Sequence, residues 1–309
     1  MDAAKMSNHP SILITGANGF TGQHACEYFS HAGYEVIATT RSKTNMSSNI
    51  QQEHLDLLNH KEVYHLISRT KPQYLLHLAG QNNVSDSWED PLSTLEANVL
   101  STAYLIDALH RINPSCKILI IGSSLQNQSI TEYPSHPYSL SKALQSILAK
   151  GWSHLYNLHI MEAKPSNLIG PGYSNGVCAL FAQKIVKMEQ GKMQPMLEVH
   201  NLLASRDFLD VRDAVSAYDM IFQKGVAGET YDISSGELRS LGEIVNELKQ
   251  LSTIGFSTKS ANNMLGDQQK VISSHKIRQL GWENKIPFQT SIKSILDFYR
   301  QNEHNSLSL

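Results

Sequence analysis

The segment PYSLSK, residues 137–142, places a tyrosine and a lysine four positions apart, at Tyr138 and Lys142. On a helix these two side chains project from the same face. The pKa of a free phenol is about 10, and a neighbouring ammonium favours the phenolate and lowers that pKa. Ser123, in the upstream segment IGSSLQ, is able to donate a hydrogen bond to a carbonyl that gains negative charge. Ser123, Tyr138 and Lys142 together predict a site that reduces a ketone or oxidises an alcohol.

A glycine-rich turn near the start of the chain favours this chemistry over the alternative of a solvated tyrosine and lysine on an exposed helix. In TGANGFTG, Gly16, Gly19 and Gly22 stand between an apolar segment and a helix-length one. Gly16 permits a tight turn, Gly19 lets the backbone approach a pyrophosphate, and Gly22 lets the helix lie close to the strand. Since a helix N-terminus offers free N–H groups to an anion, the turn predicts a dinucleotide site.

The residues that follow the second apolar segment indicate which dinucleotide binds. An acidic residue there would accept hydrogen bonds from the adenosine ribose and favour NAD. This chain instead has TTRSK, with Arg41 and Lys43. Because a guanidinium suits a 2′-phosphate, the sequence predicts NADP(H). NAD(H) is the alternative, with Arg41 stacked on the adenine.

The order of elements along the first half of the chain predicts the fold that positions these residues. Short apolar segments, partly β-branched, predict buried parallel strands at 11–16, 34–40, 74–80, 117–124 and 158–165. Helix-length segments lie between them, at 20–32, 60–70, 93–112 and 137–156. This alternation predicts an α/β fold with a Rossmann-type doubly wound parallel sheet, in which Ser123 lies at the carboxyl end of a strand.

The second half of the chain follows a different pattern. Pro and Gly in NLIGPG, residues 167–172, mark the change, and strand and helix signals are less regular beyond it. We expect an NADP-binding Rossmann domain at 1–169, with a return segment at 207–224. We expect a smaller C-terminal α+β substrate domain at 170–309, ending in a helix around 287–301.

Length and composition exclude several other classes of protein. A chain of 309 residues buries a sizeable core, and a net charge of −2 creates no field that attracts nucleic acid or an anionic membrane. No run approaches the roughly 18 apolar residues of a spanning helix. Cys26, Cys116 and Cys178 are widely spaced and no signal-peptide core opens the chain, which favours the cytoplasm. The fourteen histidines lack metal-ligand spacing, so we expect no metal site.

The motifs together resemble the extended short-chain dehydrogenases/reductases of the NAD-dependent epimerase/dehydratase family. They span nearly the whole length, as TGANGFTG, LDLLN, HLAG, ANVLST, PYSLSK, NLIGPG, SRDFLDVRD and LGW. VSDSW (84–88) and HNLLASRDFLDVRD (200–213) are most similar to the branch of GDP-mannose 4,6-dehydratase and GDP-4-keto-6-deoxy-D-mannose reductase. The resemblance implies a nucleotide-diphosphate sugar as substrate. It also implies a homodimer that packs the tyrosine-bearing helix and the helix before it against their copies.

The resemblance implies further residues at the cofactor. Asp56 and Leu57 would lie by the adenine, and Asn98 would brace the site. The full implied cofactor set is Gly16, Gly19, Phe20, Thr21, Gly22, Arg41, Asp56, Leu57, Leu78, Ala79, Gly80, Asn98, Tyr138, Lys142 and Pro165.

For the substrate, the resemblance implies that Asn167 and Arg206 bind the diphosphate, a role that suits a carboxamide and a guanidinium. The implied substrate set is Ser124, Asn167, Lys184 and Arg206. In the alternative interpretation, Arg206 pairs with Asp207 or Asp210 on the surface.

One departure from the family pattern bears on the reaction. Leu125 stands where related dehydratases carry a glutamate that moves the C5 proton, and leucine exchanges no proton. A 4,6-dehydratase is therefore disfavoured, although Glu132 is an acid nearby. We expect an NADPH-dependent reductase of a 4-keto-6-deoxy nucleotide sugar, GDP-4-keto-6-deoxymannose reductase-like, with Tyr138 as proton donor and Ser123 polarising the carbonyl. An epimerase with the same three residues is the second reading, and a non-enzymatic NADP-sensing protein is the alternative from a different class.

Overall fold

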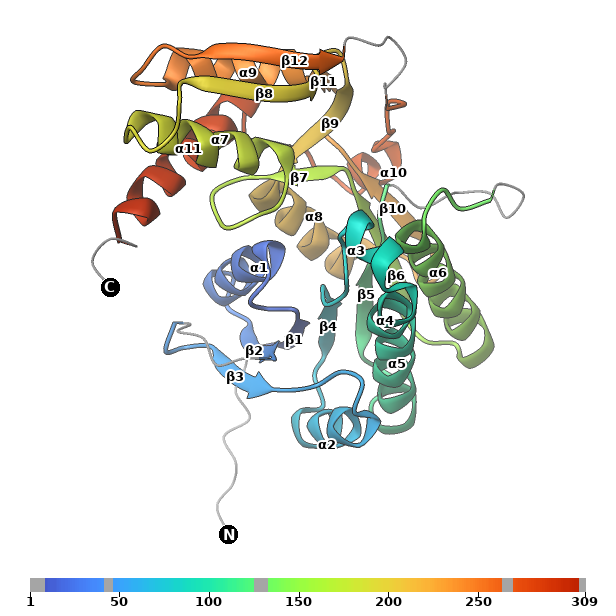
Figure 1. The fold of residues 1–309 in the computed structure, drawn as a ribbon. Helices are drawn as coiled ribbons and strands as arrows, with labels where there is room; N and C mark the ends of the chain where they lie inside the picture. Colours follow the sequence, from blue (N-terminus) through green and yellow to red (C-terminus); the bar gives the residue numbers. More distant parts are fainter. Residues whose placement is uncertain (1–8, 42–46, 125–132, 263–268, 306–309) are drawn as a thin grey trace. The chain divides into compact units, whose positions relative to one another are not determined.

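A computed structural model describes residues 9–41, 47–124, 133–262 and 269–305 (Figure 1). The chain forms two compact units. Unit 1 comprises Met1–Lys164, Val215–Tyr231 and Gln279–Trp282, and unit 2 comprises Pro165–Ala214, Asp232–Arg278 and Glu283–Leu309. Across the described part of the chain, no helix is both long and apolar enough to cross a membrane.

The largest sheet of the described structure has seven strands in the order β10-β6-β5-β4-β1-β2-β3. Their bounds are β1 (Ser11–Thr15), β2 (Glu35–Thr40), β3 (Gln51–His54), β4 (Tyr74–His77), β5 (Lys117–Ile121), β6 (Ile160–Pro165) and β10 (Thr230–Ile233). Every pairing from β3 to β6 is parallel. The five strands predicted from the sequence are confirmed. β3 was missed because its residues, QQEH, are polar and mostly exposed, so they lack an apolar strand signal.

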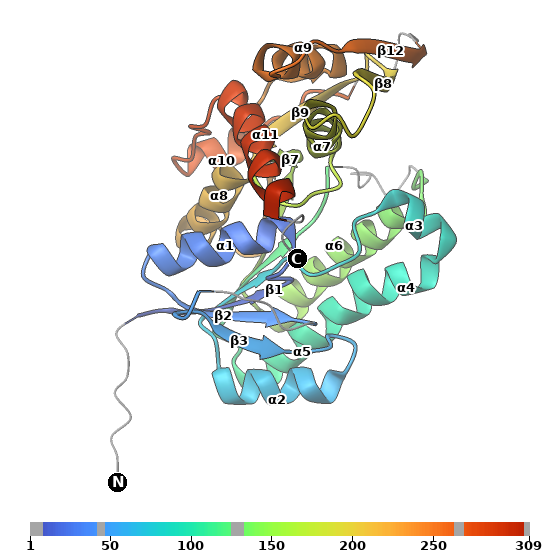
Figure 2. The ribbon, with the colours of Figure 1, turned by 60° about the vertical axis from the view of Figure 1, so that its left-hand side comes forward.

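Helices cover both faces of this sheet (Figure 2). Those of unit 1 are α1 (Phe20–His31), α2 (His60–Thr70), α3 (Val84–Glu89), α4 (Pro91–Leu95), the π-helix η1 (Glu96–Leu100), α5 (Ser101–Ile112), α6 (Pro137–Tyr156) and α8 (Val211–Lys224), which begins in unit 2. α1 lies on one face, and α2 and α5 lie on the other. The predicted doubly wound fold is confirmed. The helix expected at 93–112 is instead α4, η1 and α5 in succession.

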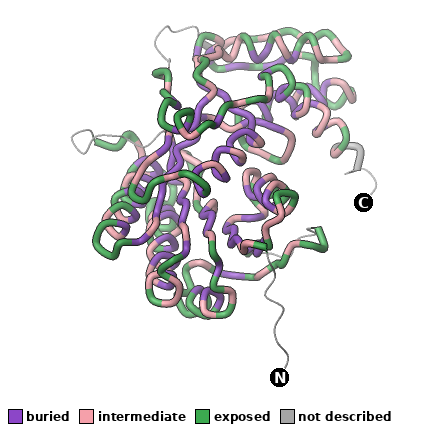
Figure 3. Tube along the Cα trace, turned by 180° about the vertical axis from the view of Figure 1, so that it is seen from behind, coloured by how far each residue is buried: buried purple, intermediate pink, exposed green. Residues whose placement is uncertain are grey.

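The core of unit 1 explains why these segments fold as they do. Leu66 of α2, Leu105 of α5 and Ala149 of α6 pack with Leu13 and Leu75 of the strands, all of them almost inaccessible to solvent. In Figure 3 purple is concentrated in the interior of the unit, in agreement with the buried residues of β1, β2, β4, β5 and β6. Burial of these apolar faces, at about 25 cal/mol per Å², holds the carboxyl ends of the strands in place.

Unit 2 contains two small sheets. The first has the order β11-β9-β7 and the second pairs β12 with β8. Their bounds are β7 (Asn167–Ile169), β8 (Met196–Asn201), β9 (Ser205–Asp210), β11 (Leu238–Ser240) and β12 (Ser257–Asn262). The helices are α7 (Val177–Glu189), α9 (Leu241–Leu251), α10 (His275–Gln279) and α11 (Phe288–Asn305). β7 and β9 are parallel, whereas β11 runs antiparallel to β9.

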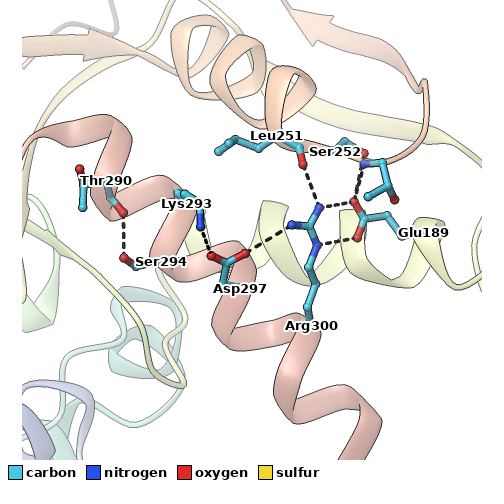
Figure 4. A network of polar contacts seen from close by, with 9 residues as sticks. Glu189, Leu251, Ser252, Thr290, Lys293, Ser294, Asp297 and Arg300 are labelled. Atoms are coloured by element: carbon cyan, nitrogen blue, oxygen red, sulfur yellow. Dashed lines mark hydrogen bonds and ion pairs between the residues drawn. The ribbon is translucent and has the colours of Figure 1, made fainter.

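An ion pair joins three helices of unit 2 (Figure 4). The guanidinium of Arg300 on α11 donates to both carboxylate oxygens of Glu189 on α7, at 2.6 and 2.9 Å, and to the carbonyl oxygen of Leu251 on α9 at 2.9 Å. The same three helices share an apolar core, in which Ile185, Leu248 and Leu296 are all nearly inaccessible to solvent. A bidentate geometry in such surroundings stabilises the packing of the three helices.

Candidate active site

The turn between β1 and α1 has the shape of an anion cradle. Gly16 adopts φ +68°, and a Cβ there would come within 2.8 Å of the backbone nitrogen of Ala79. A Cβ on Gly22 would overlap the carbonyl oxygen of Gly16. Gly19 is the N-cap of α1, and in the described structure no side chain caps this end of the helix. The first-turn residues Phe20 and Thr21 therefore fit a turn that presents backbone N–H groups to a pyrophosphate.

The residues predicted for the adenosine lie at the ends of β2 and β3. Arg41 is exposed just after β2, and its backbone oxygen accepts a 2.8 Å hydrogen bond from Nε2 of His54. Asp56 is exposed after β3, where its Oδ1 accepts from the backbone nitrogen of Leu58 at 3.0 Å. Leu57 packs against the core. Lys43 lies outside the described residues.

The segment after β4 runs between the glycine turn and Asn98. Leu78 and Ala79 are half-buried, and a Cβ on Gly80 would come within 2.5 Å of Oδ1 of Asn98. Asn98 is fully buried in η1. Its Nδ2 donates to the carbonyl oxygen of Gln81 at 3.0 Å, and its Oδ1 accepts from the Gln81 backbone nitrogen at 2.8 Å. Asn98 thus holds this backbone in a single conformation, which fits the bracing role implied by the resemblance.

Ser123 and Tyr138 meet in unit 1. Ser123 follows β5, Tyr138 stands in the first turn of α6, and their side chains are hydrogen-bonded to each other. Burial raises the pKa of the Tyr138 phenol, and the hydrogen bond with Ser123 lowers it by a smaller amount. The expectation of a lowered pKa is therefore not what the protein's own residues produce, because desolvation dominates. Near neutral pH the phenol keeps its proton.

Lys142 lies one helical turn further along α6 and is buried. Its Nζ donates to the carbonyl oxygen of Ile121 at 2.8 Å and to Oε1 of Gln145 at 2.9 Å. Burial lowers the pKa of Lys142 to about 8, while the charge of Glu162 acts in the opposite direction. At neutral pH most of the side chain is therefore still an ammonium.

Two neighbours of these residues were missed at the level of sequence. His136 is the N-cap of α6, where its Nδ1 accepts from the backbone nitrogen of Ser139 at 3.0 Å, and its ring stacks on Tyr138 with centroids 5.9 Å apart. The signal was available, since His136 precedes Pro137 at the start of the helix. Gln145 stands three residues after Lys142, a spacing that puts both side chains on one helix face.

The residues predicted for the substrate fall mostly in unit 2. Asn167 on β7 donates from Nδ2 to the carbonyl oxygen of Asp207 at 2.9 Å, and Arg206 lies on the neighbouring strand β9. Lys184 lies on α7, and these three residues are half-exposed. Pro165, predicted for the cofactor, is the buried last residue of β6. Ser124, half-buried, stays in unit 1 beside Ser123.

The two carboxylates named as alternative partners of Arg206 have other contacts. Asp207 accepts from the Ser166 hydroxyl at 2.6 Å and from two backbone nitrogens. Asp210 pairs with Arg212 at 2.8 Å. Leu125 and Glu132, on which the argument against a dehydratase depends, lie outside the described residues. Within the described ranges no group of three His, Cys, Asp or Glu is arranged to hold a metal ion.

A glycine cradle after the first strand, with a serine, a tyrosine and a lysine buried near the ends of the central strands, defines an NAD(P)-dependent oxidoreductase of the doubly wound class. A family profile gives the particular group. The chain belongs to the NAD dependent epimerase/dehydratase family, whose profile matches residues 12–234. The family that the motifs resemble is thereby confirmed.

Individual relatives match more than nine tenths of the chain. GDP-6-deoxy-D-mannose reductase of Pseudomonas aeruginosa is 29% identical over 92% of this chain and 95% of its own. The dTDP-D-glucose 4,6-dehydratase of Homo sapiens is 25% identical over 95% and 91%. The solved structure of RMD from Pseudomonas aeruginosa complexed with NADPH superposes with a TM-score of 0.82 at 27% identity, covering 95% of this chain and 99% of that one. UDP-glucose 4-epimerase from Thermotoga maritima shares the fold, with a TM-score of 0.83 at 21% identity over 95% and 99%.

Proposed function

We propose that this protein is an NADPH-dependent reductase of a 4-keto-6-deoxy nucleotide sugar, of the GDP-4-keto-6-deoxymannose type. The observation that carries the proposal is the buried Tyr138 phenol, which keeps its proton and is hydrogen-bonded to Ser123. A protonated phenol is the state that a ketone reduction requires of its acid. The similarity to the Pseudomonas aeruginosa reductase supports the choice of substrate class.

The chain's own groups perform the proton side of the reaction. When bound, the reduced nicotinamide supplies a hydride to the ketone carbon. Ser123 donates a hydrogen bond to the ketone oxygen and stabilises the charge that develops there. Tyr138 transfers its phenolic proton to the same oxygen, so that ketone, hydride and proton balance as an alcohol. The Lys142 ammonium then stabilises the phenolate that remains.

Residues of the cradle would hold the cofactor. The turn formed by Gly16, Gly19 and Gly22 would take the pyrophosphate, and Arg41 would pair with a 2′-phosphate. The NADPH in the similar Pseudomonas aeruginosa structure supports NADP(H) as the cofactor, with NAD(H) as the alternative. Asn167, Arg206 and Lys184 would bind the diphosphate and nucleotide of the substrate, and Ser124 its sugar.

A turnover assay tests this function. The purified protein is mixed with NADPH and GDP-4-keto-6-deoxymannose, and NADPH absorbance and the sugar product are followed together. We expect one NADPH to be oxidised for each ketone reduced. Interconversion of two nucleotide sugars without net loss of NADPH would instead identify an epimerase. NADPH binding without turnover on a panel of keto sugars would identify a cofactor-sensing protein.

We also propose that the protein is a homodimer. Leu140, Leu144, Ile147 and Leu155 form an apolar stripe on α6 with side chains 38–71% exposed, and such a stripe suits packing against a second copy. Sedimentation should give a dimer that Ile147→Glu converts to a monomer. Val226→Glu, at an equally exposed apolar position elsewhere, should leave the dimer intact.

We propose a location in the cytoplasm, which is supported by the free thiols of Cys26, Cys116 and Cys178.

A further inference from the structure

A series of hydrogen bonds links buried polar side chains from Thr15 to Lys142 of the candidate active site. Thr102 of α5 lies at its centre, and its hydroxyl donates to the carbonyl oxygen of Asn98 at 2.7 Å. Because a hydroxyl has a single hydrogen, Thr102 accepts the two other hydrogen bonds that reach its oxygen. One comes from Nε2 of Gln145 at 2.8 Å, and the other comes from Nε2 of His77 at 2.9 Å.

The tautomer of His77 also fixes which group donates in its hydrogen bond with Thr15. Burial, together with the charge of Lys142, lowers the pKa of His77 to about 3, so the imidazole is neutral at neutral pH. With its proton on Nε2, its Nδ1 accepts from the Thr15 hydroxyl at 2.7 Å. Thr15 in turn accepts from the backbone nitrogen of Ala79 at 3.2 Å. This series of hydrogen bonds therefore begins at β1, the strand that leads into the glycine turn.

Gln145 is the last member of this series before Lys142. Since its Nε2 donates to Thr102, its amide oxygen faces the ammonium, and Nζ of Lys142 donates to that oxygen at 2.9 Å. A second N–H of Lys142 goes to the carbonyl oxygen of Ile121 at 2.8 Å. An ammonium has three N–H groups in tetrahedral directions. Two fixed acceptors therefore fix the direction of the third.

We propose that Gln145 is a positioning residue for the reduction: its amide, held by Thr102 and through Thr102 by His77, directs the remaining N–H of Lys142 at the cofactor ribose and keeps the ammonium charge beside the Tyr138 phenol. Because this role depends on the proposed function of Lys142, it refines that function and does not replace it. Gln145 itself is 1% exposed and sits beneath the reactive groups. It acts through Lys142 and touches neither substrate nor cofactor.

The charged and titratable groups that act on Lys142 come from two strands. They are His77 on β4 and Glu162 on β6. Gln145 adds a neutral acceptor that favours the charged amine. Removing this acceptor lowers the pKa of Lys142 further, because a buried ammonium loses a hydrogen bond. Replacing it with a carboxylate raises that pKa.

The test compares Gln145→Leu with Gln145→Glu in the full-length protein, using NADPH and the keto sugar of the turnover assay. Activity requires a protonated lysine, so kcat falls as pH rises through its pKa. In Gln145→Leu we expect kcat to fall about tenfold and its basic limb to move by about one pH unit toward lower pH. In Gln145→Glu we expect the limb to move toward higher pH.

Three further variants keep the result interpretable. Ser153→Ala removes a different buried hydrogen bond of α6, to the carbonyl oxygen of Leu158, and should leave the pH profile unchanged. Lys142→Met should abolish turnover, and if it does not, the proposed function itself is wrong. Thr102→Val removes the hydrogen bond that holds the Gln145 amide and keeps Gln145 itself. It replaces Gln145→Leu if that variant fails to fold, and its basic limb should also move toward lower pH. If Lys142→Met is inactive while the profiles of the Gln145 variants stay in place or move in one direction together, the positioning role is overturned.

Discussion

The two units use buried polar groups for different purposes. In unit 1 the hydrogen bonds from Thr15 through His77 and Gln145 end on Lys142, a residue of the candidate active site. In unit 2 the partly buried ion pair between Glu189 and Arg300 ends on structural elements and joins helices. The substrate-binding candidates of unit 2 are half-exposed. Unit 1 therefore holds its reactive groups rigidly, whereas unit 2 holds its scaffold rigidly and leaves its proposed ligand contacts accessible.

The largest expected effect tests the reactive side of this comparison. Tyr138→Phe removes the proposed acid while leaving the glycine turn and Lys142 in place. Turnover should fall by roughly 10²–10⁴-fold, and NADPH affinity, measured by fluorescence titration, should stay within a small factor of the original. Retention of turnover would show that another group donates the proton. Tyr133→Phe, at a tyrosine that is almost fully exposed, is the matched control and should have full activity.

Acid should destabilise unit 1 through His77. Its pKa is about 3 in the folded protein and about 6.5 in the unfolded chain, so the unfolded state binds more protons between these values. The free energy of unfolding should fall as pH drops through this window, by about 1.4 kcal/mol per pH unit from this group. His77→Gln, which removes the titrating ring, should flatten the dependence. Urea unfolding followed by tryptophan fluorescence measures it.

That fluorescence reports on unit 1 alone, because Trp88, Trp152 and Trp282 all belong to it. An unchanged slope in His77→Gln would mean that other histidines, such as His159, whose pKa is also lowered by burial, control the acid response.

Breaking the ion pair of unit 2 should leave the chemistry of unit 1 in place. Arg300→Ala strands the carboxylate of Glu189, which is largely buried, and should cost about 2 kcal/mol of unfolding free energy. Circular dichroism should show the loss while NADPH binding persists. Arg111→Ala removes an exposed ion pair with Asp107, four residues away on the same helix. It should lower the free energy of unfolding by only about 0.3 kcal/mol. Equal losses in the two variants would contradict the structural role given to the Arg300 pair.

The smallest effect concerns the exposed edge of the cofactor site. Arg41→Ala should weaken NADPH binding roughly tenfold through loss of one charged hydrogen bond, with little change for NADH. Lys71→Ala, which removes an exposed cation at the end of α2, is the control. Parallel titrations with the two cofactors measure the preference. An unchanged ratio would remove Arg41 from the 2′-phosphate site.

Much of the site could be predicted from the sequence because its residues are local. The glycine turn, the Tyr138–Lys142 spacing and the apolar strands are each short segments whose meaning follows from geometry along one element. Features that depend on contacts between distant residues could not be predicted in this way. Residues 93–112 have the periodicity of one helix, but the π-turn that buries Asn98 depends on its contacts with Gln81, distant in the chain. Among the protein's own residues, burial raises the pKa of Tyr138, and this burial in the assembled fold is not visible in the spacing of residues.

The sequence by itself determined the fold class, the dinucleotide turn and the identity of the serine, tyrosine and lysine, since each of these is written in a contiguous pattern of apolar, glycine and polar residues. Only the tertiary structure decided what surrounds them. Thr15, His77, Thr102 and Gln145 come from four separate elements, and packing alone brings their side chains together beneath Lys142. The physical reason is that hydrogen bonds and desolvation act over a few ångströms in space, and residues far apart along the chain become neighbours only after the core has formed.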